Sequence, residues 1–258
     1  FVKTPAQIQR EQDYSITRLH PAGRKVTRHV HGEGQLAYVV KGTMWLRVES
    51  GWWLATPHCA LWVAPGIEHE ARYSEDSEVL TLYLKDSADL IEHDISLMHC
   101  TSLMSELIRE YAQENIQVKS MNQPENDLIR ALILRYLNKD TIYKDLHLPS
   151  GSDARLKAVT EKMQSAPGED HTLKGLASRA GLSDRTLARL FEKETGMKFT
   201  RWKELLRINV AIEMLISGRS ITAVAFDVGY QSTSSFTTAF TRIKGTSPKQ
   251  YIKKLLQK

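Results

Sequence analysis

Short apolar stretches, each ending near a glycine or a proline, run from about Tyr14 to Leu84. Within residues 44–49 the aliphatic positions 44, 46 and 48 alternate with Trp45, Arg47 and Glu49, and VLTLYL at 79–84 is a second strand candidate. Short strands at regular spacing are typical of an antiparallel sandwich or barrel. We therefore expect residues 1–90 to form a β-barrel domain.

The pattern becomes helical from about Ile91 to Asn138. Apolar side chains recur at helical spacing on two separate faces, comprising Cys100, Met104, Leu107, Ile108 and Tyr111, and then Leu128, Ile129, Leu132, Ile133, Tyr136 and Leu137. We interpret residues 91–143 as a helical connector, which either packs against the barrel or forms a dimer interface. Residues 144–153, KDLHLPSGSD, contain clustered Pro, Gly and Ser and are predicted to be a linker.

Helix boundaries are clearly marked from Ala154 to the end of the chain. Five candidate N-cap residues precede helical runs, namely Thr172, Ser183, Ser220, Ser232 and Ser247. Glycines stand where helices should end, at positions 181, 196, 218, 229 and 245. We expect residues 154–258 to form an all-helical domain with about seven helices, so that the chain as a whole is a multidomain α+β protein.

The helical half contains an internal repeat. LASRAGLSDRTLARLFEKETG, from Leu176, aligns with VAFDVGYQSTSSFTTAFTRIKG, from Val224, when one residue is inserted after the first glycine. Each copy predicts a short helix with a small alanine, a glycine-centred turn and a longer helix. This is the helix-turn-helix pattern, in which small residues let two helices cross closely and the second helix presents its outer face. The helix LLRINVAIEML at 205–215 connects the two copies.

This half resembles the DNA-binding domain of the AraC/XylS transcription regulators. The resemblance rests on GLSDRTLARLFEKETG, on Arg207 and Ala211 in an R-x3-A pattern, and on AVAFDVGYQSTSSFTTAFTRIKGTSPKQY. It implies two helix-turn-helix units that read successive major grooves of double-stranded DNA. It also implies recruitment of RNA polymerase, with activation the common outcome and repression left open.

The first predicted recognition helix presents Arg185, Ala188 and Arg189 outward. Arginine suits bidentate contact with guanine, whereas the alternative for these arginines is phosphate contact or solvation. The second recognition helix presents Thr233, Ser234, Thr237 and Thr238. Because the family commonly has an arginine in place of Thr238, we expect the second helix to read bases weakly, or mainly to position the backbone. Phosphate candidates near helix ends are Arg201, Lys203, Arg242, Lys244 and Lys249.

The N-terminal half resembles the two cupin motifs, through Gly23-x5-His29-x-His31-x3-Gln35-x6-Gly42 and PGIEH ending at His69. Alternate residues of a strand face the same side, so His29 and His31 can both enter the barrel. With His69 they would form a three-histidine set of the kind that binds Zn, Fe or Ni.

Two departures from the cupin pattern argue against reactive metal chemistry. The metal-binding glutamate of the family is Gln35 here, a neutral and poor ligand, and Pro65 stands one place late. The alternative to a metal is a polar floor in which His29, His31, Gln35 and His69 hydrogen-bond a small-molecule ligand or one another. Trp62, which precedes the Pro65-Gly66 turn, is the best aromatic candidate for the same pocket.

Charge and composition agree with a DNA-binding protein. From Gly151 onward the chain carries 19 Lys and Arg against 10 Asp and Glu, whereas the first 150 residues carry 16 against 20. Only the second half is therefore expected to meet a polyanion. No apolar run approaches the ~18 residues of a membrane span, and two distant cysteines suit a reducing cytoplasm. We expect a bacterial cytoplasmic protein that joins the nucleoid when it is bound to DNA.

Three hypotheses follow from these patterns. The leading one is a homodimeric, sequence-specific transcription regulator whose DNA binding or activation is modulated by a small molecule in the cupin domain, with no catalytic residues. The second is a cupin metalloenzyme fused to a DNA-binding domain. The third is an architectural DNA-binding protein without a ligand.

Overall fold

The computed structural model describes residues 13–87, 91–116, 123–138 and 144–256. Contacts within the chain divide it into two compact units. The first comprises residues up to 48 together with 55–144, and the second comprises 49–54 together with 145–257. Each unit is described by itself.

The first unit contains a five-stranded antiparallel sheet with the order β1-β8-β3-β6-β9. Its strands are β1 (Tyr14–His20), β3 (Gly34–Lys41), β6 (Cys59–Val63), β8 (Ser77–Leu84) and β9 (Ile95–His99). Strand β3 is central and buried on both faces over most of its length. Its register places Gln35 between Val63 and Tyr83.

Three further strands of this unit are neighbours in a second sheet, in the order β4-β7-β2. They are β2 (Lys25–His29), β4 (Met44–Val48) and β7 (His69–Arg72), and both pairings are antiparallel. The unit is thus a β-sandwich of the cupin-like kind, as the spacing of its short strands predicted.

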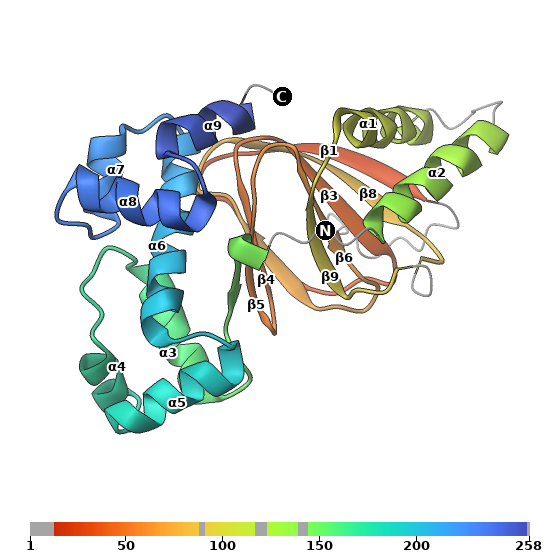
Figure 1. Ribbon diagram of the computed structural model, residues 1–258. Coiled ribbons are helices and arrows are strands. Elements are labelled where there is room, and N and C mark those ends of the chain that lie inside the picture. Colours follow the sequence, from red (N-terminus) through yellow and green to blue (C-terminus); the bar gives the residue numbers. More distant parts are fainter. Residues whose placement is uncertain (1–12, 88–90, 117–122, 139–143, 257–258) are drawn as a thin grey trace. The chain divides into compact units, whose positions relative to one another are not determined.

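Two helices of the first unit, α1 (Ser102–Ile116) and α2 (Gln123–Leu137), cover one face of the first sheet (Figure 1). The core between them includes Leu36, Tyr38 and Trp62 from the sheet and Ile108 and Ile133 from the helices. The expected helical segment from Ile91 is wrong at its start, because residues 95–99 form β9 beside β6. Their partner strand lies more than thirty residues away in the chain, so local periodicity does not reveal it.

The second unit contains a two-stranded antiparallel pair and seven α-helices within its described part. The pair joins β5 (Gly51–Ala55) to β10 (His147–Pro149), which follows a short 3-10 helix, η3 (Lys144–Leu146). The linker predicted over 144–153 is therefore partly structured. Trp202 Nε1 donates a hydrogen bond of 2.7 Å to the Pro149 carbonyl, which ties this strand to the helices.

The seven helices follow one another with short turns. They are α3 (Ala154–Ser165), α4 (Leu173–Arg179), α5 (Asp184–Thr195), α6 (Phe199–Ile216), α7 (Ile221–Asp227), α8 (Thr233–Lys244) and α9 (Pro248–Leu256). Of the predicted N-caps, Thr172, Ser183, Ser220 and Ser232 each accept a hydrogen bond from a backbone N–H in the first turn. Gly196 and Gly245 end α5 and α8 in the left-handed conformation, which costs glycine little. The helix punctuation of the sequence is confirmed here.

None of the helices in the described ranges is both long enough and apolar enough to span a membrane.

Candidate functional sites

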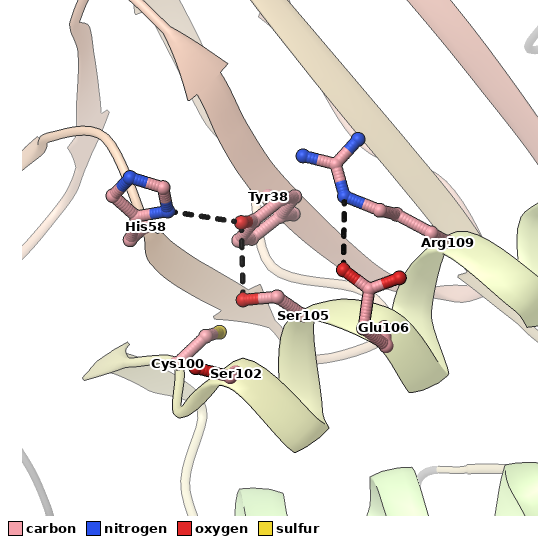
Figure 2. A pocket seen from close by; sticks show the side chains of 7 residues that line it. All are labelled: Tyr38, His58, Cys100, Ser102, Ser105, Glu106 and Arg109. Atoms are coloured by element: carbon pink, nitrogen blue, oxygen red, sulfur yellow. Dashed lines mark hydrogen bonds and ion pairs between the residues drawn. The ribbon is translucent and has the colours of Figure 1, made fainter. Parts of the chain in front are cut away.

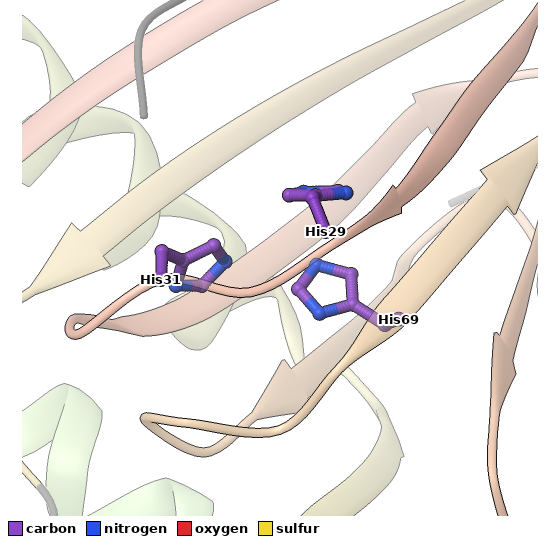
Figure 3. Close-up of side chains that lie close together, drawn as sticks. All are labelled: His29, His31 and His69. Atoms are coloured by element: carbon purple, nitrogen blue, oxygen red, sulfur yellow. The ribbon is translucent and has the colours of Figure 1, made fainter. Parts of the chain in front are cut away.

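Three histidines from two strands and a loop converge in the first unit (Figure 3). His29 ends β2 and lies directly opposite His69 at the start of β7, while His31 follows in the loop before β3. Their ring centroids are 4.3 Å (His29–His69), 5.0 Å (His31–His69) and 5.8 Å (His29–His31) apart. One ring nitrogen from each lies within 4.8 Å of the others. The predicted three-histidine set is therefore brought together.

The three rings are held in the same way by backbone carbonyls. Each Nδ1 lies 2.7–2.8 Å from the carbonyl of a residue two positions away, in the pairs His29–Thr27, His31–Glu33 and His69–Ile67. In a neutral imidazole this makes Nδ1 the donor and leaves the lone pair on Nε2. Histidines that bind metals are oriented by such outer hydrogen bonds.

Gln35 joins the cluster from β3, as predicted. Its Oε1 lies 2.9 Å from His31 Nε2 and 3.3 Å from His69 Nε2. When both rings are protonated at Nδ1, the two Nε2 atoms and the amide oxygen are all acceptors. Either a cation among them or an amide turned over, so that its NH2 group donates to both rings, relieves this conflict. The geometry fits both of the predicted alternatives, a metal site and a polar floor.

The surroundings of His69 favour its neutral form. The pKa of His69 is lowered to about 4, chiefly by burial and also by the neighbouring His29 and His31, whereas the hydrogen bond to Ile67 opposes the shift. His69 is therefore neutral near pH 7 and its Nε2 lone pair is available. The set of candidate ligands contains no carboxylate.

The structure adds Tyr83 to this site and removes Trp62 from it. The Tyr83 ring makes an edge contact with His31 at 5.4 Å between centroids, and the residue is paired with Gln35 in the sheet. Trp62 is paired with Leu36 instead, and therefore lies on the opposite face, where its Nε1 donates to the His93 carbonyl at 3.1 Å. The prediction that Trp62 lines this pocket is therefore wrong, because Trp62 faces the other side of the sheet. The alternation of VLTLYL is the sequence signal that could have identified Tyr83.

The first helix-turn-helix unit consists of α4 and α5. Leu187 and Phe191 are buried, while Arg185 and Arg189 are exposed one turn apart and Ala188 is half-buried between them. The inward and outward faces agree with those read from the sequence, and the two guanidinium groups are accessible.

The second helix-turn-helix unit consists of α7 and α8 and presents a different surface. Phe236 and Phe240 are buried, so that the outer face carries only hydroxyl side chains before Arg242. Ser234 and Thr238 are exposed, whereas Thr233 and Thr237 are half-buried. The two recognition helices therefore differ in charge as well as in sequence.

Arg207 of α6 links the second helix-turn-helix unit to the loop between α3 and α4. Its guanidinium donates to the carbonyls of Gly229 (3.1 Å), Pro167 (3.3 Å) and Glu169 (3.2 Å), and it lies 5.8 Å from the centre of the Tyr230 ring. A Cβ on Gly229 would lie 2.7 Å from the Gly168 carbonyl oxygen as well as 2.5 Å from this guanidinium, and the φ of Gly229 is +86°, so the position favours glycine. The sequence marked Arg207 through the R-x3-A pattern alone, and the structure gives it three acceptors.

Most of the predicted phosphate contacts have carboxylate partners. Arg201 and Arg242 both pair with Glu204, and Lys203 pairs with Asp170 at 3.0 Å. The Lys244 side chain is fully buried and pairs with Asp145 at 2.7 Å. The prediction that Lys244 contacts phosphate is therefore wrong, because its ammonium group does not reach the surface. Lys249 is exposed at the start of α9. Arg201 and Arg242 would have to exchange Glu204 for a phosphate on binding DNA.

Comparison with known proteins agrees with both halves. Residues 13–135 match the AraC-like ligand-binding domain and residues 176–254 match a helix-turn-helix domain. The chain is 30% identical to the HTH-type transcriptional regulator NimR of Escherichia coli over 229 residues, which is 88% of this chain and 82% of that protein.

Two further comparisons cover a similar share of the chain. It is 25% identical to the RCS-specific HTH-type transcriptional activator RclR of Escherichia coli, over 88% of this chain and 72% of that protein. A crystal structure of ToxT from Vibrio cholerae covers 95% of this chain, and this chain covers 100% of ToxT, at 13% identity and a TM-score of 0.41.

The relatives named above are transcriptional regulators, as the leading hypothesis expects. The chain belongs to the AraC family of helix-turn-helix transcriptional regulators, with an N-terminal AraC-like ligand-binding domain of the cupin type and a C-terminal DNA-binding domain.

Proposed function

We propose that this regulator is a transcriptional activator whose affinity for its operator depends on an effector bound at the cluster of His29, His31, Gln35 and His69. The observation that carries the proposal is the convergence of three oriented histidines in the ligand-binding half of a DNA-binding protein. Such a cluster offers several lone pairs to one small ligand, and a sensor needs that kind of specific site.

Base reading is assigned to the first recognition helix. Arg185 and Arg189 are exposed on one face of α5, and a guanidinium can make two parallel hydrogen bonds to guanine O6 and N7. The hydroxyl-bearing α8 would contribute weaker, shape-dependent contacts through Ser234 and Thr238. Arg201, Arg242 and Lys249 would contact phosphates and position both helices.

A divalent metal is one effector that fits the histidine cluster. His29, His31 and His69 would hold Zn, Fe or Ni through Nε2, and Gln35 would offer its amide oxygen. The ion would supply positive charge to a site that has no carboxylate ligand, and would link β2, β7 and the loop before β3. A small molecule that donates hydrogen bonds to the same lone pairs is the alternative.

The effector would act by having different affinities for two arrangements of the regulator. A ligand changes an equilibrium only by the difference between its two binding free energies, so the site must be better formed in one arrangement than in the other. We infer that the active form is a homodimer, because Leu128 and Leu132 are exposed one turn apart on α2. The dimer would recruit RNA polymerase when both DNA-binding domains engage their half-sites.

The proposal is tested by selecting operator DNA from a random pool with the full chain, and then measuring affinity with and without metal. A preferred sequence is expected, with affinity that changes at least several-fold between EDTA-treated protein and protein supplied with Zn²⁺, Ni²⁺ or Fe²⁺. The variant His69→Phe should bind the same DNA but lose the response. Selection that yields no preferred sequence would favour an architectural protein. A response to neither metals nor small molecules would exclude the cluster as the effector site.

A further inference from the structure

A cavity of the first unit lies away from the histidine cluster, between the first sheet and the beginning of α1 (Figure 2). Its volume is about 80 Å³, and one water needs ~10–15 Å³ by the same measure. It therefore has room for a ligand of about five non-hydrogen atoms. Tyr38 of β3 and Cys100, which lies between β9 and α1, contribute buried parts of its lining.

The hydroxyl groups of Tyr38 and Ser105 form one polar wall of this cavity. The buried Tyr38 hydroxyl donates to Ser105 Oγ at 3.1 Å and lies 3.3 Å from His58 Nδ1. A phenol has one proton, so when that proton is used on Ser105, His58 must donate to the phenol oxygen. The proton of the Ser105 hydroxyl then remains available for an acceptor in the cavity. The Ser105 hydroxyl thus offers a hydrogen-bond donor to an occupant of the cavity.

His58 lies on the other side of the cavity in a strained conformation. Its φ of 62° is in the left-handed region, which residues other than glycine rarely adopt. Two backbone hydrogen bonds hold it there, from His58 N to the Val39 carbonyl and from Cys100 N to the His58 carbonyl. Such strain persists where surrounding structure enforces it, and it concentrates at ligand sites.

Arg109 supplies positive charge at the rim. Ser102, Ser105 and Arg109 lie on one face of α1, and the guanidinium reaches to 5.6 Å from the centre of the Tyr38 ring (Figure 2). Its ion pair with Glu106 is loose, at 4.0 Å, and the Glu106 side chain is 76% exposed. Among the described lining residues Glu106 is the only acidic one, and because its side chain is so exposed it can turn to solvent and leave the guanidinium to another carboxylate.

Cys100 adds an uncharged surface to the lining. Burial raises the pKa of the Cys100 thiol well above its usual range, so the sulfur is a neutral, weakly polar surface beside the Tyr38 ring. A ligand with one anionic end and a short hydrocarbon body would match the guanidinium at the rim and the sulfur and ring inside. Phosphate would match the first of these features but not the second.

We propose that this cavity binds a small aliphatic carboxylate, held by Arg109 and the Ser105 hydroxyl, with its hydrocarbon part against Tyr38 and Cys100. The occupant bridges α1 and the sheet, and therefore stabilises the position of α1 on the sheet. As an extension that rests on the proposed function, this would make the cavity a second effector site, distinct from the histidine cluster.

Saturation-transfer-difference NMR of the full chain with sodium propionate tests the binding, with ionic strength held constant by NaCl. We expect saturable binding with a dissociation constant on the order of 1 mM, since the ligand is small. Arg109→Gln should weaken it at least tenfold. Glu106→Gln should strengthen it several-fold by removing the competing carboxylate, a gain that misfolding cannot produce. Arg135→Gln, at an exposed arginine of α2, is the matched control and should bind like the wild type.

Several outcomes would overturn the assignment. These are the absence of saturable binding, equal binding of the neutral propionamide, unchanged binding by Arg109→Gln, and displacement of propionate by a lower concentration of inorganic phosphate. Because this test contains no DNA, it is independent of the proposed function. A separate measurement of operator affinity with and without 10 mM propionate, on the wild type and Arg109→Gln, tests the regulatory extension.

Discussion

Removing the guanidinium of Arg207 should loosen the α7–α8 turn and the loop between α3 and α4, while leaving α4 and α5 themselves intact. Arg207→Met keeps most of the aliphatic volume of the side chain and deletes its hydrogen bonds to Gly229, Pro167 and Glu169. The Glu169 bond is exposed, so water replaces it there, whereas the other two bonds are partly buried. A buried acceptor left unpaired costs about 1–3 kcal/mol, and the lower part of that range gives a local loss of about 1–1.5 kcal/mol at each place, at Gly229 in the α7–α8 turn and at Pro167 in the loop between α3 and α4.

Hydrogen–deuterium exchange measured by mass spectrometry reads this loss region by region. Since ~1.4 kcal/mol corresponds to a factor of ten, amides in peptides covering residues 225–240 should exchange about 5- to 12-fold faster in the variant. Exchange rates in peptides covering residues 176–190, in the first helix-turn-helix unit, should be unchanged. Arg155→Met is the control, because the Arg155 pair with Asp153 is largely exposed and contributes little.

DNA binding offers a second reading of the same variant. One DNA-binding domain should bind a DNA site that has both of its major-groove segments more tightly than a site that has only the segment read by α5. A loosened α7–α8 turn should reduce this gain in affinity. Exchange rates in 225–240 within twofold of the wild type would refute the argument, since the three carbonyls would then not depend on Arg207.

Four further predictions concern separate parts of the chain. Arg189→Ala should weaken binding to the selected operator by about 1–3 kcal/mol but alter non-specific binding in the same buffer less than threefold; equal losses in a gel-shift titration would mean that Arg189 contacts phosphate only. Gln35→Glu should raise Zn²⁺ affinity at least tenfold in a chelator competition, because a carboxylate replaces a neutral amide oxygen, and His69→Phe should abolish binding; unchanged affinity in Gln35→Glu would mean that Gln35 is no ligand. His20, stacked on Tyr73 at 3.9 Å, has a pKa lowered to about 4 by burial, and by Arg24 and Arg18; the unfolded chain therefore binds a proton that the folded chain does not, and the free energy of unfolding should fall by up to about 1.4 kcal/mol per pH unit for this group as pH drops from 6.5 towards 4. Urea titrations of His20→Phe should show a shallower dependence, and an identical slope would contradict the burial argument. Leu128→Asp with Leu132→Asp should shift a dimer to a monomer in sedimentation velocity without altering the circular dichroism, whereas Leu19→Asp, at an exposed leucine of β1, should not.

The DNA-binding half could be predicted almost completely from its sequence because its signals are local. An N-cap serine, a glycine in the left-handed conformation and apolar positions at helical spacing each act within one or two turns, and so the caps at Ser183 and Ser232 and the buried Phe191 and Phe240 were readable without a structure. The three histidines were also predictable, since i and i+2 positions and a distant partner histidine follow a recognised motif.

Long-range pairing decided what the sequence left open. Strands β9 and β10 are short, and their partners lie far away in the chain, so local periodicity assigned them to a helix and a linker. Trp62 shares its sheet with Gln35 but faces the other side, because the register between β3 and β6 determines which residues point together. Composition could not distinguish these two faces.

Side-chain partners across the fold decided the rest. The sharing of Glu204 by Arg201 and Arg242, the burial of Lys244, the three carbonyls around Arg207 and the cavity beside Tyr38 all join residues from different elements. The sequence by itself determined which helices form, which of their faces are buried and which family motifs are present, because those properties arise from neighbours in the chain. Only the tertiary structure determined which charges are available to DNA and which polar groups converge on a ligand, because such contacts depend on the packing of residues distant in sequence.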